Sequence, residues 1–254
     1  MKSKTMRVTT YFFKRMLRQI LYGLGVVLAI ILFSWLLSNR DTEFFANFKI
    51  QFGALIGFFA MFVALTPYAD FKLLIQNGVS RRTFWLGRTI ALVVINLLGQ
   101  VLDMILGFFK IGTPVAENSA AWQLYGRFFQ SASLNWLIWA VLVLVGSTVT
   151  VLLASVVGSC FSLLTKRVRR YVFLALAAAF FLGIRLIAMV MTGDAVVHFA
   201  IWLRNIIYFL IGGTPNVGAG HFNPTVPFIS LLVLCSAALV ASYYVTQQFK
   251  IKNE

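Results

Sequence analysis

Three polar side chains lie within one long apolar stretch of the sequence, at a spacing that brings them together. Asn96, Gln100 and Asp103 occupy positions i, i+4 and i+7, which share one face of an α-helix. In a hydrocarbon environment such a face must turn toward protein or water, because an unpaired polar group is costly there. The spacing therefore predicts an inward-facing polar surface, which either fixes helix packing or lines a transport path.

Arg185 is the only other ionised residue deep in an apolar stretch. At a rise of about 1.5 Å per residue, Asp103 and Arg185 lie about 24 and 21 Å from the starts of their helices. Because these depths are similar, we predict that the two side chains meet between helices. A packing ion pair is the favoured interpretation, and a direct role in a transport path is the alternative.

The sequence carries no recognised pattern for catalysis or nucleotide binding. It has no G-x-x-x-x-G-K-[ST] loop, no G-x-S-x-G elbow and no H-E-x-x-H pair. His198 and His221 have no carboxylates at metal-ligand spacing, and Cys160 and Cys235 lie in apolar runs, as buried small residues would. We expect no catalytic residue, metal site or cofactor in this chain, so any ATP and Mg²⁺ would be bound by a partner.

The composition indicates an all-α integral membrane protein. Of the 254 residues, 60% are hydrophobic and 11% are charged, and the mean hydropathy is +0.88, whereas soluble domains are about one quarter charged. The formal charge of +15 comes from cations at the ends of apolar runs, where they orient helices, so no nucleic-acid partner is expected. Runs of about 20 apolar residues predict six transmembrane helices: 20–38, 50–68, 88–109, 133–164, 171–192 and 226–247.

Basic residues are divided unequally between the two sides of these spans. The larger share lies before the first span, between the second and third, between the fourth and fifth, and after the sixth. The positive-inside rule therefore places both termini in the cytosol. Residues 1–19 have the pattern of an amphipathic helix at the inner membrane surface. Residues 199–211, which are interrupted by Arg204 and Asn205, are too short to span and predict a re-entrant or interfacial segment.

The connection between the second and third spans is long, basic and half apolar. Asp70 is a suitable N-cap, Asn77-Gly78 is a typical left-handed stop, and the apolar positions between them share one helical face. The pattern predicts a helix over 70–77 that is too short to be stable alone. Its apolar side would face the headgroup layer or a groove in a cytosolic partner. The candidate docking residues are Asp70, Phe71, Lys72, Leu74, Ile75, Asn77, Gly78, Arg81 and Arg82.

This arrangement resembles the membrane subunits of ATP-binding-cassette (ABC) exporters of the type-two class. The resemblance in layout covers nearly the whole chain: an N-terminal amphipathic helix, six spans, a short cytosolic helix between spans two and three, and a re-entrant segment before span six. The most specific passage is LIQNGVSRRTFWLGR, which is similar to the G-x-S-R-R-x-F pattern that follows the coupling helix in small bacterial permeases of this class.

The resemblance implies that residues 70–77 are a coupling helix that docks into a separate ATPase subunit. In that family two permease subunits and two ATPases form a transporter, and the small bacterial members export lipids, amphipathic peptides, antibiotics or polysaccharides across the plasma membrane. We therefore expect a non-catalytic subunit that works as a homodimer or heterodimer in the lipid bilayer. The alternative is the substrate-binding membrane subunit of a vitamin importer, which would lack the docking helix. An intramembrane hydrolase is disfavoured by the missing catalytic patterns.

Overall fold

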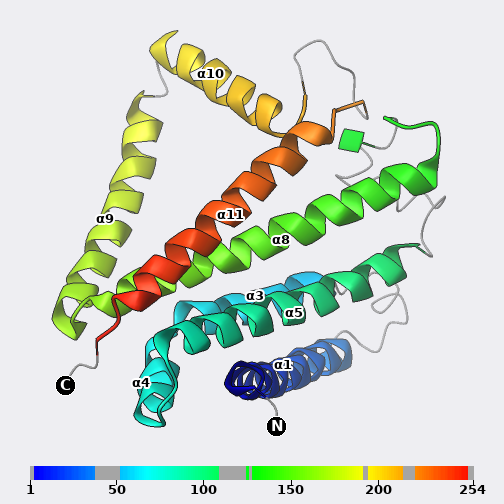
Figure 1. Ribbon diagram of the computed structural model, residues 1–254. Helices are drawn as coiled ribbons and strands as arrows, with labels where there is room; N and C mark the ends of the chain where they lie inside the picture. The colour runs from blue at the N-terminus through cyan, green and yellow to red at the C-terminus, as the bar shows by residue number, and fades with distance from the viewer. Residues whose placement is uncertain are drawn as a thin grey trace. The chain divides into compact units, whose positions relative to one another are not determined.

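The computed structural model describes residues 3–37, 52–108, 124–125, 128–190, 194–213 and 221–250. Within these ranges the long elements are all α-helices, which confirms the expected all-α class for this part of the chain (Figure 1). In chain order they are α1 (Lys4–Leu37), α3 (Phe52–Leu65), α4 (Tyr68–Gln76), α5 (Arg81–Phe108), α8 (Ala132–Leu163), α9 (Lys166–Val190), α10 (Asp194–Leu210) and α11 (Thr225–Gln247). Residues 1, 2, 38, 50, 51, 109, 191 and 192 of the predicted elements lie outside the described residues.

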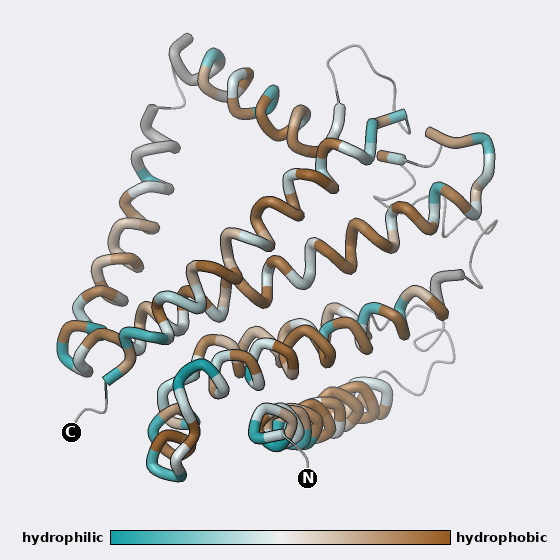
Figure 2. Tube along the Cα trace, in the orientation of Figure 1, coloured by the Kyte–Doolittle hydropathy of each residue, from teal (hydrophilic) through white to brown (hydrophobic). Residues whose placement is uncertain are grey.

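Several helices are long and apolar enough to cross a membrane. Among the described residues, α1, α5, α8 and α11 qualify individually, and α3 with α4 makes a fifth if the bent pair counts as one span. Apolar residues dominate long parts of these helices (Figure 2). The chain therefore has the character of a membrane protein. The count of six spans stays a prediction, as does the re-entrant segment at 199–211, most of which falls within α10.

The chain divides into two compact units, which are described separately. The first comprises residues 1–109, 146–159 and 235–254, and the second comprises residues 110–145 and 160–234. In the second unit, Tyr125, Leu142 and Phe222 form a small buried cluster. Burial raises the pKa of the Tyr125 phenol, which donates a hydrogen bond to the Ile211 carbonyl at 3.0 Å. The expectation of a single domain over 1–254 stays a prediction.

Helix α1 is continuous, and the predicted roles of residues 1–19 as a surface helix and of 20–38 as a span stay predictions. Its 34 residues correspond to about 51 Å, well beyond the roughly 30 Å of a hydrocarbon core. Val8, Phe12 and Met16 recur every four residues and are buried, and α1 packs against α5. The apolar stripe that predicted a membrane-surface helix is therefore covered by the chain itself, because such a stripe fits a neighbouring helix equally well.

Helix α5 begins at Arg81, earlier than the predicted residue 88. Ser80 precedes this start, and its Oγ atom accepts a hydrogen bond from the Thr83 amide at 3.2 Å. A serine in this position satisfies one of the amides that have no partner within the helix. The basic residues before position 88 thus form the first turns of α5. A search for apolar runs cannot detect such turns. Helix α9 likewise begins in a basic turn, at Lys166.

Helix α4 follows α3 after a sharp bend, and the two helices differ in direction by 60°. Because α4 begins at Tyr68, Asp70 lies in its first turn and Pro67 occupies the N-cap position, which corrects the predicted cap. The other end agrees with the sequence. Gly78 has a φ of 73°, and the amides of Gly78 and Val79 donate to carbonyls in the last turn of α4. The predicted left-handed stop is therefore confirmed.

Four phenylalanines from separate segments of the first unit pack edge to face around α4. The ring centroid of Phe71 in α4 lies 5.4 Å from that of Phe84 in α5. It lies 5.0 Å from that of Phe249, which follows α11. Phe84 also contacts Phe12 of α1 at 5.7 Å, and all four rings are almost fully buried. Such pairs add about 0.5–1.5 kcal/mol each beyond the burial of apolar area. This aromatic cluster fixes α4 to α1, α5 and the C-terminal segment.

Replacing Phe71 with alanine should therefore destabilise the protein strongly. Phe71→Ala removes the central ring of the aromatic cluster, and a buried Phe→Ala change costs about 3–5 kcal/mol. Leu73→Ala is the matched control on the same helix, because Leu73 is 48% exposed and its truncation should change stability by no more than about 0.5 kcal/mol. Thermal unfolding of both variants in detergent checks the difference, and equal melting temperatures would contradict the assignment.

Candidate functional site

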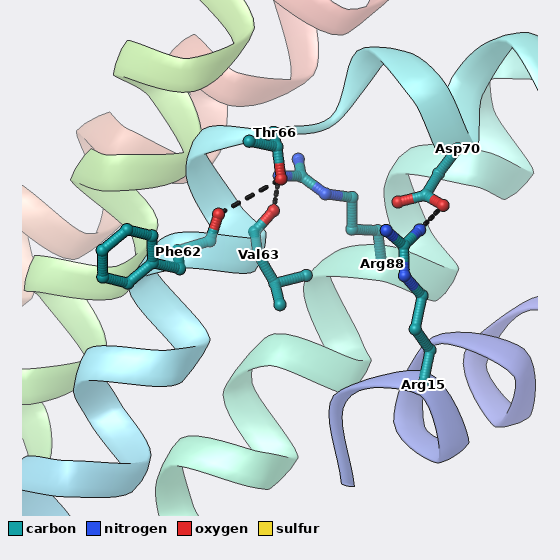
Figure 3. Close-up of polar contacts among 6 residues, drawn as sticks. All are labelled: Arg15, Phe62, Val63, Thr66, Asp70 and Arg88. Atoms are coloured by element: carbon teal, nitrogen blue, oxygen red, sulfur yellow. Dashed lines mark hydrogen bonds and ion pairs between the residues drawn. The ribbon is translucent and has the colours of Figure 1, made fainter. Parts of the chain in front are cut away.

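Asp70 joins the short helix α4 to α1 through an ion pair. Its carboxylate is buried and bonds the Arg15 guanidinium of α1 (Figure 3). Asp70 lies in the first turn of α4, where a negative charge also interacts favourably with the helix dipole. Loss of Arg15 would leave the buried Asp70 carboxylate without a partner, which is more costly than loss of a surface pair.

Arg88 holds the end of α3 at the bend. Its guanidinium is buried and donates a hydrogen bond to the Val63 carbonyl at 3.2 Å (Figure 3). It also donates to the Ala64 carbonyl at 2.5 Å and to Ser155 Oγ at 3.0 Å. The last carbonyls of a helix have no partner within it and carry partial negative charge. Arg88 therefore satisfies these carbonyls with a charge of the favourable sign and allows α3 to end inside the protein.

The C-terminal segment also contacts the start of α5 and α4. The Arg81 guanidinium donates to the Gln247 carbonyl at 2.9 Å, and the Trp85 indole donates to Ser242 Oγ at 2.9 Å. With the ring contact of Phe249, these bonds attach the end of α11 to α4 and to the start of α5. Helices α1 and α5 and the C-terminal segment thus hold α4.

The predicted docking residues divide between a buried and an exposed side. Phe71 and Leu74 are buried against the chain itself, so these two side chains are not available as anchors for a partner. Asp70 is buried as well, and Lys72 and Ile75 are partly exposed. Asn77, Gly78, Arg81 and Arg82 are exposed, together with Leu73, which the sequence analysis did not single out. The docking role of residues 70–77 stays a prediction.

The polar face of α5 turns toward α3 and α8, as its spacing predicts. Asn96 is fully buried, and its Nδ2 atom donates to Ser147 Oγ at 3.0 Å and to Thr148 Oγ1 at 3.2 Å, both on α8. Gln100 is also buried, and Asp103 is partly buried. Hydroxyl groups of α8 therefore pair with the polar face of α5 in the region of Asn96.

Between these helices lies a pocket of about 260 Å³. Small residues of α3 form one wall, and the carboxamides of α5 and the hydroxyls of α8 form the others. The lining residues are Gly53, Ala54, Gly57, Phe58, Met61, Asn96, Gln100, Ser147, Thr150 and Val151. All of them belong to the first compact unit. Among the described residues, no group of three His, Cys, Asp or Glu side chains is placed to hold a metal ion.

Asp103 contacts the start of α3. Its Oδ2 atom accepts a hydrogen bond of 2.6 Å from the Gly53 amide in the first turn of α3. Arg185 is exposed on α9 and belongs to the second compact unit. The pairing of Asp103 with Arg185 therefore stays a prediction.

Sequence reasoning missed the inward role of Arg88, although a signal was present. Arg88 lies eight positions before Asn96, so both residues share the polar face of α5. The analysis had counted Arg88 with the cations at the cytosolic end of a span. Ser155, which lies seven positions after Thr148 on α8, gave a matching signal.

The chain matches no family model, no curated protein and no solved structure. Its function is therefore inferred from its residues and their geometry.

Exchange of the charges in the Arg15–Asp70 pair tests the contact between α1 and α4. Asp70→Arg should destabilise the protein by about 3–5 kcal/mol, because it places two cations together at a buried position. Adding Arg15→Asp should recover at least about 1 kcal/mol of this loss. Adding Arg18→Asp instead should recover none, since Arg18 is exposed and one turn away. Thermal unfolding of the three variants measures the recovery, and equal recovery by both second changes would contradict the pair.

Removal of the Arg88 guanidinium should loosen the bend. Arg88→Met keeps the length of the side chain but deprives the Val63 and Ala64 carbonyls of their donor, at a cost of about 1.5–3 kcal/mol. We expect a lower melting temperature and faster amide hydrogen exchange in a peptide covering the end of α3 and α4. Arg82→Met, at an exposed position of the same helix, is the control that should leave both measurements unchanged. Unaltered exchange in Arg88→Met would show that the bend does not depend on Arg88.

Proposed function

We propose that this chain is the membrane subunit of an ATP-driven exporter, and that α4 receives a separate ATPase subunit. The observation that supports this most is α4 itself, a helix of nine residues set at 60° to α3, bound to the chain on one side and exposed on the other. The resemblance of LIQNGVSRRTFWLGR to type-two ABC permeases supplies the class of partner. ATP and Mg²⁺ are bound and ATP is hydrolysed in that partner.

The exposed side of α4 has the chemistry of a docking surface. Leu73 is its large apolar residue, and Gln76 and Asn77 follow it at i+3 and i+4 on the same face. Arg81 and Arg82 lie beyond the stop and are exposed. A groove with an apolar centre and an acidic edge complements this surface, since a buried apolar anchor gives affinity and charges at the rim give orientation.

The buried side of α4 explains how a movement of the partner reaches the membrane helices. Phe71 and Asp70 attach α4 to α5 and α1, and Arg88 attaches α5 to the end of α3. A push on α4 therefore displaces three helices together rather than bending a flexible loop. In the proposed assembly two such chains and two ATPases open a path for an amphipathic or hydrophobic substrate across a bacterial plasma membrane, with both termini in the cytosol.

Reconstitution in proteoliposomes tests the proposed function. The chain is combined with a candidate P-loop ATPase of the same organism, and the movement of fluorescent lipids and amphipathic peptides is followed. Transport should require ATP, this chain and an intact P-loop lysine in the partner. An ATPase that neither associates with the chain nor drives movement of any probe would overturn the proposal.

The docking surface is tested separately by Leu73→Ser. Loss of a central apolar anchor typically weakens an interface by about 2 kcal/mol or more, which corresponds to roughly 30-fold in Kd. Leu17→Ser is the matched control, because Leu17 is similarly exposed but lies on α1. Co-purification and ATPase stimulation should fall in the first variant alone, while both keep the melting temperature of the wild type. Normal association of Leu73→Ser would exclude this face of α4 as the docking site.

A further inference from the structure

We infer that the pocket between α3, α5 and α8 binds the nitrogen head group, ammonium or amide, of a small amphipathic molecule. This inference deepens the proposed function, because it names the class of substrate for the path. The binding itself concerns this chain alone and can be measured without an ATPase.

The pocket exists because α3 has small residues on the side that faces it. Gly57 leaves space opposite Asn96 of α5, whereas Gly53 packs closely against Gln100. A methyl group added at Gly57 would lie 3.4 Å from Asn96 Oδ1, so this oxygen faces a position where α3 has no side chain. At roughly 30 Å³ for each water-sized group, 260 Å³ holds about nine such groups. The pocket therefore fits a head group with a few carbons and excludes the body of a lipid.

One polar atom at this pocket lacks a partner among the described residues. Asn96 is 0% exposed, and its Oδ1 atom accepts no hydrogen bond there, although Nδ2 makes two. A buried acceptor left unpaired is destabilising, because it loses its hydrogen bonds to water without replacement. A donor on a ligand would satisfy this atom, so the free energy lost in the empty protein becomes a contribution to binding.

The charges around the pocket favour a donor over an anion. None of the described residues that line it is basic, whereas the Asp103 carboxylate contacts Gly53 in its wall. A carboxylate or phosphate would enter without a counter-charge, which is unfavourable at low polarity. An ammonium or amide group can donate to the oxygen atoms of the lining residues. Phe58, which is largely exposed at the edge of the pocket, and Met61 provide apolar area for the chain of the ligand.

Photo-crosslinking with three matched probes tests this inference. Each probe carries the same decyl chain and a diazirine beside its head group, which is a primary ammonium, a primary carboxamide or a carboxylate. The full chain is placed in phosphatidylcholine nanodiscs without an ATPase, and labelled peptides are identified by mass spectrometry. The ammonium and carboxamide probes should label α3 between residues 53 and 61, and excess dodecanamide should suppress the labelling. The carboxylate should label this segment about tenfold less, the loss equivalent to one strong hydrogen bond.

Two glycine variants provide the structural control. Gly57→Leu fills the pocket without removing any polar atom, and it should reduce labelling about tenfold, to the level of the carboxylate probe. Gly25→Leu makes the same change on α1, where no atom lies within 4 Å, and should leave labelling unchanged. Melting temperatures verify that both variants fold. If Gly57→Leu does not fold, the comparison of the three probes on the wild-type chain decides the question.

Equal labelling by the carboxylate probe would overturn the inference, as would labelling that dodecanamide or Gly57→Leu does not reduce. A pocket occupied by a second copy of the chain would give no labelling by any probe and would also overturn it. The predicted head-group pattern in a chain that associates with no ATPase would retain the site and reject the proposed function. ATP-driven transport without labelling would retain the proposed function and reject the site.

Discussion

Helix α3 is held at both ends by opposite charges from α5, and the first compact unit depends on this constraint. Asp103 accepts the Gly53 amide in the first turn of α3, and Arg88 donates to the Val63 and Ala64 carbonyls in the last. Both signs complement the helix dipole. The distances also agree, since Arg88 and Asp103 lie about 22 Å apart along α5 and α3 is about 21 Å long. Without these contacts the end groups of α3 would lose their charged partners in a setting that offers little water.

The secured end of α3 allows the chain to turn sharply into α4. A helix of nine residues is not stable alone, and α4 is stabilised by tertiary contacts, chiefly those of Phe71 and Asp70. Its most apolar residues are therefore used internally. What remains for a partner is the opposite face around Leu73, presented on a support that three other segments hold. This division between a buried and an exposed side gives the helix both rigidity and an available surface.

The sequence was informative where spacing alone decides the outcome. The polar face of α5 and the stop at Gly78 follow from helical geometry and from the permissive backbone of glycine, and both are found. Periodicity shows which residues share a face, but it does not show what covers that face. The stripe of α1 through Phe12 therefore suggested a membrane surface, and Phe71 suggested a partner, while both in fact pack within the chain. An estimate of depth likewise compares the positions of Asp103 and Arg185 along their helices and does not show which residues lie beside them. It therefore could not reveal the contact of Asp103 with Gly53.

Helix α4 and the pocket are connected through α3 and α5, so a displacement of α4 would affect the pocket. The N-terminal part of α3 forms a wall of the pocket, and its C-terminal part is bound by Arg88 beside the bend. Gly99 lies against Ile56 and Gly158 against the backbone of Leu65, so closely that a methyl group at either glycine would clash. Because α3 is packed this tightly, we expect it to move as a body rather than to adjust locally. A displacement of α4 therefore alters the space between α3 and α5 at Asn96, where an incoming head group would find the unpaired oxygen.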